Sequence, residues 1–63
     1  MEPYQDRVLN EKAELDSRLE KLQSFLDTAT FKELDAVEQE RLRKQAGIMQ
    51  EYSAVLADRI AHF

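Results

Sequence analysis

Cationic and aromatic side chains gather in one short segment of the second half of the chain. In RLRKQAGIMQEYS, residues 41–53, helical spacing places Arg41, Lys44 and Gln45 on overlapping faces, and Tyr52 continues that strip. Arginine binds phosphate oxygens in a bidentate manner, and a tyrosine ring can stack on a nucleobase. These types at this spacing favour a site for a small anionic, nucleotide-like ligand. The candidate ligand-binding residues are Arg41, Lys44, Gln45 and Tyr52, with Lys12 and Arg7 from the first half of the chain.

The same segment also has a purely structural interpretation. Lys44 would pair with Glu40 in solvent, Gln45 would make one polar contact that sets register, and Tyr52 would be a core residue with a wet hydroxyl. Gly47, the only glycine, would allow another helix or a ligand to approach closely. Both interpretations stay open at the level of sequence.

The inventory of catalytic residue types is small. The chain has one histidine, His62, and no cysteine, so it lacks the usual set of metal ligands and the usual nucleophile–base pairs. It also lacks a glycine-rich phosphate loop. We therefore expect no enzyme, no metal and no cofactor.

The charge balance argues against duplex nucleic acid as a partner. Thirteen acids against nine bases give a net charge of −4, whereas proteins that bind DNA through their overall field are usually basic. No apolar run approaches the roughly 18 residues of a membrane span, and the N-terminal residues do not resemble a signal peptide. With no cysteine to form disulfides, the chain is expected in the cytosol.

The apolar spacing predicts an all-α protein. One glycine and one proline in 63 residues, with many Leu, Glu, Lys and Ala, are typical of helices. We expect one hairpin domain over residues 1–63, with antiparallel helices over about 3–27 and about 36–62 and a corner over about 28–35. The apolar stripe of the first helix consists of Val8, Leu15, Leu19, Leu22 and Leu26, and that of the second of Leu42, Met49, Tyr52, Leu56, Ile60 and Phe63, interrupted by Gln45.

The corner contains turn and cap residues. Thr30 with Glu33 fits a capping box, which predicts a short helical turn over residues 31–34, closed by Phe31 and Leu34. The second helix would begin near residue 35. In the expected register, facing residue numbers sum to about 64, so that Lys12 faces Tyr52 and the polar exceptions of both stripes lie in adjacent layers.

The stripes are too wide for two helices alone. The apolar residues Leu9, Phe25, Ile48 and Val55 flank them and would stay exposed in a lone hairpin. We therefore predict a homo-oligomer with coiled-coil-like packing, most simply a dimer that forms a four-helix bundle.

Several elements of the chain resemble a family of small phage and prophage proteins of about sixty residues, named by relation to a hypothetical protein of a crAss-like phage. The resemblance covers nearly the whole chain. The matching elements are YQxRV at residues 4–8, EKxELD at residues 11–16, Phe25 and Phe31 around the corner, and QxxxMxxYxxxLxxRI at residues 45–60. The resemblance implies a phage setting and carries no activity of its own.

In size and expected architecture the chain is also similar to small phage-encoded helical hairpins that act as immune-evasion sponges of the anti-CBASS and anti-Thoeris type. This similarity implies sequestration of a nucleotide second messenger by a non-catalytic oligomer. The alternatives are a module that inhibits a host protein through a helical face and an oligomer with a purely structural role.

Overall fold

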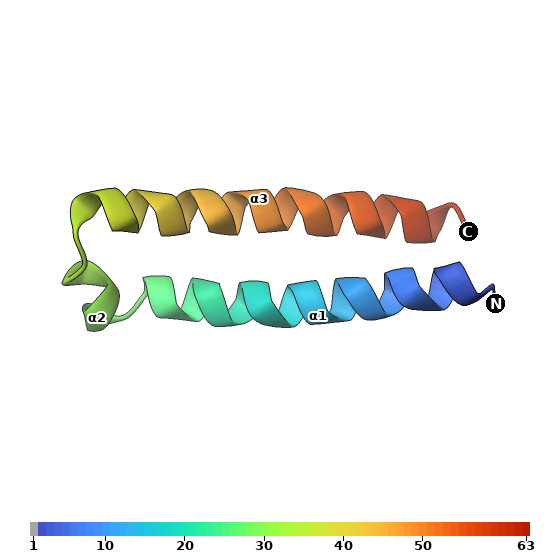
Figure 1. Cartoon of the computed structure of the whole chain (residues 1–63), viewed down its shortest axis with the longest axis horizontal. Coiled ribbons are helices and arrows are strands. Elements are labelled where there is room, and N and C mark those ends of the chain that lie inside the picture. The colour runs from blue at the N-terminus through green and yellow to red at the C-terminus, as the bar shows by residue number, and fades with distance from the viewer. Residues whose placement is uncertain (1) are drawn as a thin grey trace.

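Two long helices packed side by side make up the molecule. The computed structural model describes residues 2–63 and contains α1 (Pro3–Leu26), α2 (Ala29–Lys32) and α3 (Ala36–Ala61). Figure 1 shows that α1 and α3 run in opposite directions, that α2 forms the corner, and that both termini lie at the other end. The molecule measures 46 × 14 × 13 Å, so it is a narrow rod about as long as its two long helices. The prediction of an all-α fold with a long helix pair is confirmed.

Local side-chain contacts define where the long helices begin. Pro3 occupies the first turn of α1, where its fixed φ suits a helix and its missing N–H is not needed. The Glu2 backbone N–H donates to Gln5 Oε1 at 2.8 Å. At the start of α3, Asp35 Oδ2 accepts from the Val37 N–H at 3.1 Å, as expected of an acidic N-cap. No helix within residues 2–63 combines the length and the apolar character that crossing a membrane requires.

The corner differs from the expected capping pattern. The Phe31 N–H donates to Thr28 Oγ1 at 3.2 Å, and the Thr28 hydroxyl donates to the Phe25 carbonyl at 2.6 Å. Thr28 is extended, with φ −92° and ψ 158°, so it is the N-cap of α2. The predicted short helical turn at the corner is confirmed as α2, which begins two residues earlier than expected, and the predicted cap at Thr30 is wrong, since Thr30 lies inside α2. The Thr28 hydroxyl therefore caps the C-terminal end of α1 and the N-terminal end of α2.

Aromatic pairs close both ends of the hairpin. At the corner, Phe31 is 2% exposed and packs edge-to-face on Phe25, with ring centroids 6.0 Å apart. The Arg43 guanidinium carbon lies 5.2 Å from the Phe31 centroid, in cation–π range. At the open end, Tyr4 and Phe63 form a second edge-to-face pair at 5.8 Å. The predicted role of Phe31 as the plug of the corner is confirmed.

The core lies along a narrow seam between α1 and α3. Its buried members are Val8, Leu15 and Leu19 on α1 and Ala46 and Leu56 on α3. Leu42, Met49, Ser53 and Ile60 continue the α3 side and are half-buried. The expected α3 stripe was therefore wrong at Gln45 and Tyr52, where Ala46 and Ser53 lie in the seam instead. It was also wrong at Phe63, which lies beyond α3 and is 41% exposed. Small side chains in the seam let the helices approach, and the larger residues one position earlier turn outward.

The register of the two helices also differs from expectation. Asp16 contacts Ser53 and Tyr4 contacts Phe63, so facing residue numbers sum to 69 and 67 rather than to 64. Ser53, rather than Tyr52, occupies the seam. It contacts Asp16, which lies one turn beyond Lys12 on α1. The polar residue opposite α3 is therefore Asp16.

Candidate functional site

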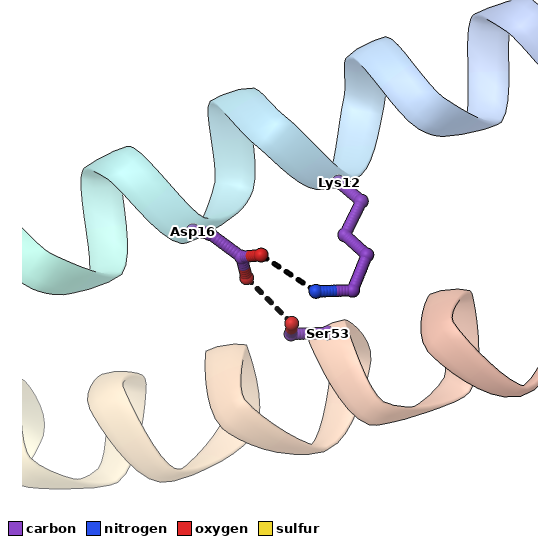
Figure 2. Close-up of polar contacts among 3 residues, drawn as sticks. All are labelled: Lys12, Asp16 and Ser53. Carbon is purple, nitrogen blue, oxygen red and sulfur yellow. Dashed lines mark hydrogen bonds and ion pairs between the residues drawn. The ribbon is translucent and has the colours of Figure 1, made fainter.

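A small polar layer interrupts the apolar seam. Figure 2 shows Lys12 and Asp16, one turn apart on α1, facing Ser53 of α3. Lys12 Nζ lies 2.6 Å from Asp16 Oδ2, and the Ser53 hydroxyl donates to Asp16 Oδ1 at 2.5 Å. The Lys12 and Asp16 side chains are 27% and 43% exposed. We call these three residues the polar layer; they join α1 to α3 at one fixed register.

The polar layer favours the ionised form of its carboxylate. The hydrogen bond from Lys12, and after it the hydrogen bond from Ser53, hold the pKa of Asp16 below its ordinary value of 3.8, against a smaller opposing effect of desolvation. Asp16 is thus ionised at neutral pH, and it neutralises Lys12. The charge of Lys12 is engaged within the hairpin.

A second row of residues runs along one flank of α3. It recurs alternately at every third and fourth position, beside the buried seam rather than in it. We call this row the α3 strip; its members are Arg41, Gln45, Ile48, Tyr52, Val55 and Arg59, all exposed. Ile48 and Val55 are 55% and 56% exposed and Tyr52 is 44% exposed, so the centre of the strip is apolar and aromatic and both ends are cationic.

The structure brings three of the predicted site residues together on this strip. Arg41, 70% exposed, has a guanidinium nitrogen 3.9 Å from Glu38, a long contact that leaves most of its donors free. Gln45 donates to the Met49 sulfur at 3.8 Å, and Tyr52 lies farther along the same flank. Lys44 is exposed at the edge of the strip, next to Gln45.

The two α1 candidates lie apart from these residues. Lys12 is held in the polar layer, and Arg7 is exposed near the start of α1. Among the ion pairs within residues 2–63, the pair of Arg41 with Glu38 is present and the expected pair of Lys44 with Glu40 is not. Of the cations predicted for the site, Arg41 and Lys44 are therefore the two available at the surface of α3.

Sequence reasoning missed three residues. Asp16 and Ser53 complete the polar layer, and Arg59 ends the α3 strip. The position of Arg59 could have been found by continuing the three-and-four spacing from Tyr52 through Val55. Ser53 carries no such signal, because serine is usually an exposed residue and nothing in its spacing marks it as part of the seam.

The strip presents hydrogen-bond donors and an aromatic face on a convex surface. Guanidinium and ammonium groups can neutralise phosphate, and the Tyr52 ring can cover a base. Within residues 2–63 there is no enclosed pocket and no cluster of side chains suited to hold a metal ion.

Fold and surface together define a class of small, all-helical hairpin proteins with a cationic and aromatic strip on one helix. The chain belongs to the Sequestin family, which matches residues 2–62. It is 42% identical over 60 residues to an uncharacterized 7.5 kDa protein from the denB–rIIB intergenic region of Enterobacteria phage T4, and the match covers 95% of this chain and 94% of that protein. No solved structure matches it. The resemblance to a small phage family is confirmed, and the relation to a crAss-like phage stays a prediction.

Proposed function

We propose that this protein sequesters a small anionic, nucleotide-like signal of the phage-infected cell, without catalysis and as a homo-oligomer. The observation that carries the proposal is the α3 strip, where Arg41, Gln45 and Tyr52 share one exposed flank with Lys44 at its edge. The family name Sequestin supports sequestration, and the T4 relative supports a phage setting.

Local charge is the physical basis of the proposal. The chain carries a net charge of −4, so its overall field repels polyanions. The α3 strip contains two arginines and no acid among its six members, which makes it a local exception. A ligand small enough to contact only this strip would meet cations at phosphate and a ring at the base, whereas a long nucleic acid would also meet the acidic surfaces.

A direct binding experiment tests the proposal. We expect a panel of cyclic di- and trinucleotides to contain a ligand that raises the melting temperature and binds in calorimetry. Replacing both Arg41 and Lys44 by Gln should abolish this binding. Lys21→Gln is the control, since it removes an exposed α1 cation. Absence of binding by every member of the panel, or equal binding by the double variant, would contradict the proposal.

A second candidate function is inhibition of a host protein through the same flank. The exposure of Ile48 and Val55 favours it, because an apolar centre with a polar rim is typical of protein interfaces. A pull-down with purified protein, followed by denaturation of the complex, separates the two functions. Release of a nucleotide supports sequestration, and a stoichiometric host protein that the Ile48→Asp variant fails to capture supports inhibition. Failure to retain either one favours a purely structural oligomer.

A further inference from the structure

The α3 strip has a cation at each end and an apolar centre. From its N-terminal end the order is cation, amide, aliphatic, aromatic, aliphatic, cation, at Arg41, Gln45, Ile48, Tyr52, Val55 and Arg59. Its midpoint lies near residue 50. A surface with this pattern is self-complementary under a two-fold rotation, in which residue i meets residue j and j meets i.

We propose that a second copy of this chain docks on the α3 strip, with the two α3 helices antiparallel about a two-fold axis near residue 50, and that each end of this contact forms an anion site shared by Arg41 of one copy and Arg59 of the other. Ile48 packs on the partner's Tyr52, and Gln45 lies against the partner's Val55. This inference rests on the proposed capture of an anion by an oligomer. It adds the docking face and a new ligand residue, Arg59, and in the paired form it assigns the Tyr52 ring to the interface instead of to a nucleobase.

Burial of the centre favours this occupant. Ile48, Tyr52 and Val55 expose 55%, 44% and 56% of their surfaces in a single copy. In the antiparallel pair an aliphatic side chain meets an aromatic ring on each side of the axis, so both copies bury the same apolar groups. An unrelated partner would need an apolar centre and an acid at each end, while a second copy already supplies the apolar centre.

The ends of the contact carry an excess of positive charge. The rotation places Arg41 beside the partner's Arg59, and Glu38, 3.9 Å from Arg41, is the acid of the same flank. His62 lies one turn beyond Arg59, with Nδ1 3.5 Å from Asp58 of its own chain. One Glu38 carboxylate therefore balances only one of the two guanidinium groups. A phosphate-like anion that bridges both arginines removes the repulsion and completes the interface.

The size of the contact makes it dependent on that anion. Eighteen residues separate Arg41 from Arg59, a length of about 27 Å along a helix about 10 Å wide. Such a footprint falls well below the roughly 800 Å² that each partner contributes to a standard interface. The copies should thus associate weakly alone and more tightly when an anion binds the associated form.

Disulfide trapping tests the geometry, because the native chain has no cysteine. We expect an equimolar mixture of Arg41→Cys and Arg59→Cys chains to form the mixed disulfide under mild oxidation. Arg41→Cys alone should not cross-link to itself, since antiparallel copies hold these positions about 27 Å apart. Preferential self-linking of Arg41→Cys would indicate a parallel pair and overturn the proposal. Equal trapping of a control mixture of Ala54→Cys with Arg59→Cys would also overturn it, since Ala54 is exposed on a different flank of α3.

Sedimentation with and without inorganic phosphate tests the interface and the shared site separately. We expect phosphate to lower the dimer dissociation constant severalfold, Ile48→Asp to give a helical monomer, and Ala54→Asp, exposed on a different flank of α3, to leave the dimer unchanged. Arg59→Gln should abolish the phosphate effect. A dimer that Ile48→Asp does not weaken, or a phosphate effect that persists in Arg59→Gln, overturns the inference. Both of these contrary results leave nucleotide binding by Arg41 and Lys44 untouched. Conversely, a dimer that responds to phosphate and to the variants as expected but binds no nucleotide contradicts only the proposed function.

Discussion

At the scale of single residues, Asp16 shows how a polar group is accommodated in a thin core. Each of its carboxylate oxygens has a partner, one on its own helix and one on α3. A carboxylate with both oxygens engaged loses little on partial burial, because the lost water contacts are replaced. The polar layer therefore contributes specificity of register, which the apolar residues beside it do not determine alone.

The lowered pKa of Asp16 has a measurable consequence. Because its pKa is lower in the folded than in the unfolded chain, this carboxylate stabilises the fold above its ordinary value of 3.8 and loses that contribution as pH falls through the lowered folded pKa. NMR titration should place the Asp16 pKa below 3.8. Lys12→Met should raise that pKa more than Ser53→Ala does, and the reverse order would contradict the assignment of causes.

Leu56 is the residue whose truncation should cost most in the seam. It is 0% exposed, within the cluster with Val8 and Leu15. Leu56→Ala should lower the free energy of unfolding by about 2–5 kcal/mol, from lost transfer energy and the remaining cavity. Chemical denaturation followed by circular dichroism measures the change. Val37→Ala, 51% exposed on the same helix, is the control, and a comparable loss there would argue against this placement of the core.

At the scale of elements, the corner depends on which threonine acts as the cap. Thr28 accepts from the Phe31 N–H and donates to the Phe25 carbonyl, while Thr30 lies inside α2. Thr28→Ala should cost about 1 kcal/mol. Thr30→Ala should be close to neutral, because alanine favours a helix interior. Thermal melts of the two variants decide the point, and a larger loss for Thr30→Ala would restore the capping box that the sequence suggests.

The only glycine of α3 gives a test of what covers that helix. A Cβ built on Gly47 meets nothing within 4 Å. In a single hairpin, Gly47→Ala should therefore stabilise α3 by up to about 1 kcal/mol through helix propensity. Melting at low protein concentration measures this gain. If the variant instead weakens self-association, a second copy contacts Gly47, and the docking face must extend beyond the α3 strip.

The helices and their arrangement were predictable from the sequence, but which side chains of α3 are buried was not. Leucines on α1 identify its buried face without ambiguity, because large apolar residues are the usual core residues. On α3, Ala46 and Ser53 lie in the seam although neither has a large apolar side chain. Their larger neighbours Gln45 and Tyr52 therefore seemed to belong to the stripe. Burial there depends on how closely two backbones approach, which single-residue hydrophobicity does not encode.

The candidate site was only partly predictable from the sequence. Arg41, Gln45 and Tyr52 share a flank because helical spacing alone places them there. Lys12 was predicted to contact the ligand because the expected register places it opposite Tyr52, whereas its partner in the structure is Asp16. Only the contact of Asp16 with Ser53 shows that this pair belongs to the packing of α1 on α3.

At the scale of the whole molecule, the hairpin leaves much of its apolar surface uncovered. Six large apolar residues among those the structure describes are more than 40% exposed, and three of them lie on the α3 strip. If copies associate through that surface, folding and assembly are coupled by mass action. The midpoint of thermal unfolding should then rise with protein concentration. A midpoint that stays constant from micromolar to millimolar concentration, with sedimentation as a monomer, would contradict the predicted oligomer.

The two aromatic pairs at opposite ends of the hairpin imply an order of folding. Phe25 and Phe31 are six residues apart, whereas Tyr4 and Phe63 are separated by 59. The entropy of loop closure makes the second contact more costly by about 2 kcal/mol if it forms first. The cheaper route starts at the Phe25–Phe31 contact and adds one turn of α1 and α3 at a time. The polar layer then lets only the correct register continue past the middle of the hairpin, since helices in the wrong register would leave Asp16 without its hydrogen bond from Ser53. The ends near Tyr4 and Phe63 are the last to join and the first to separate.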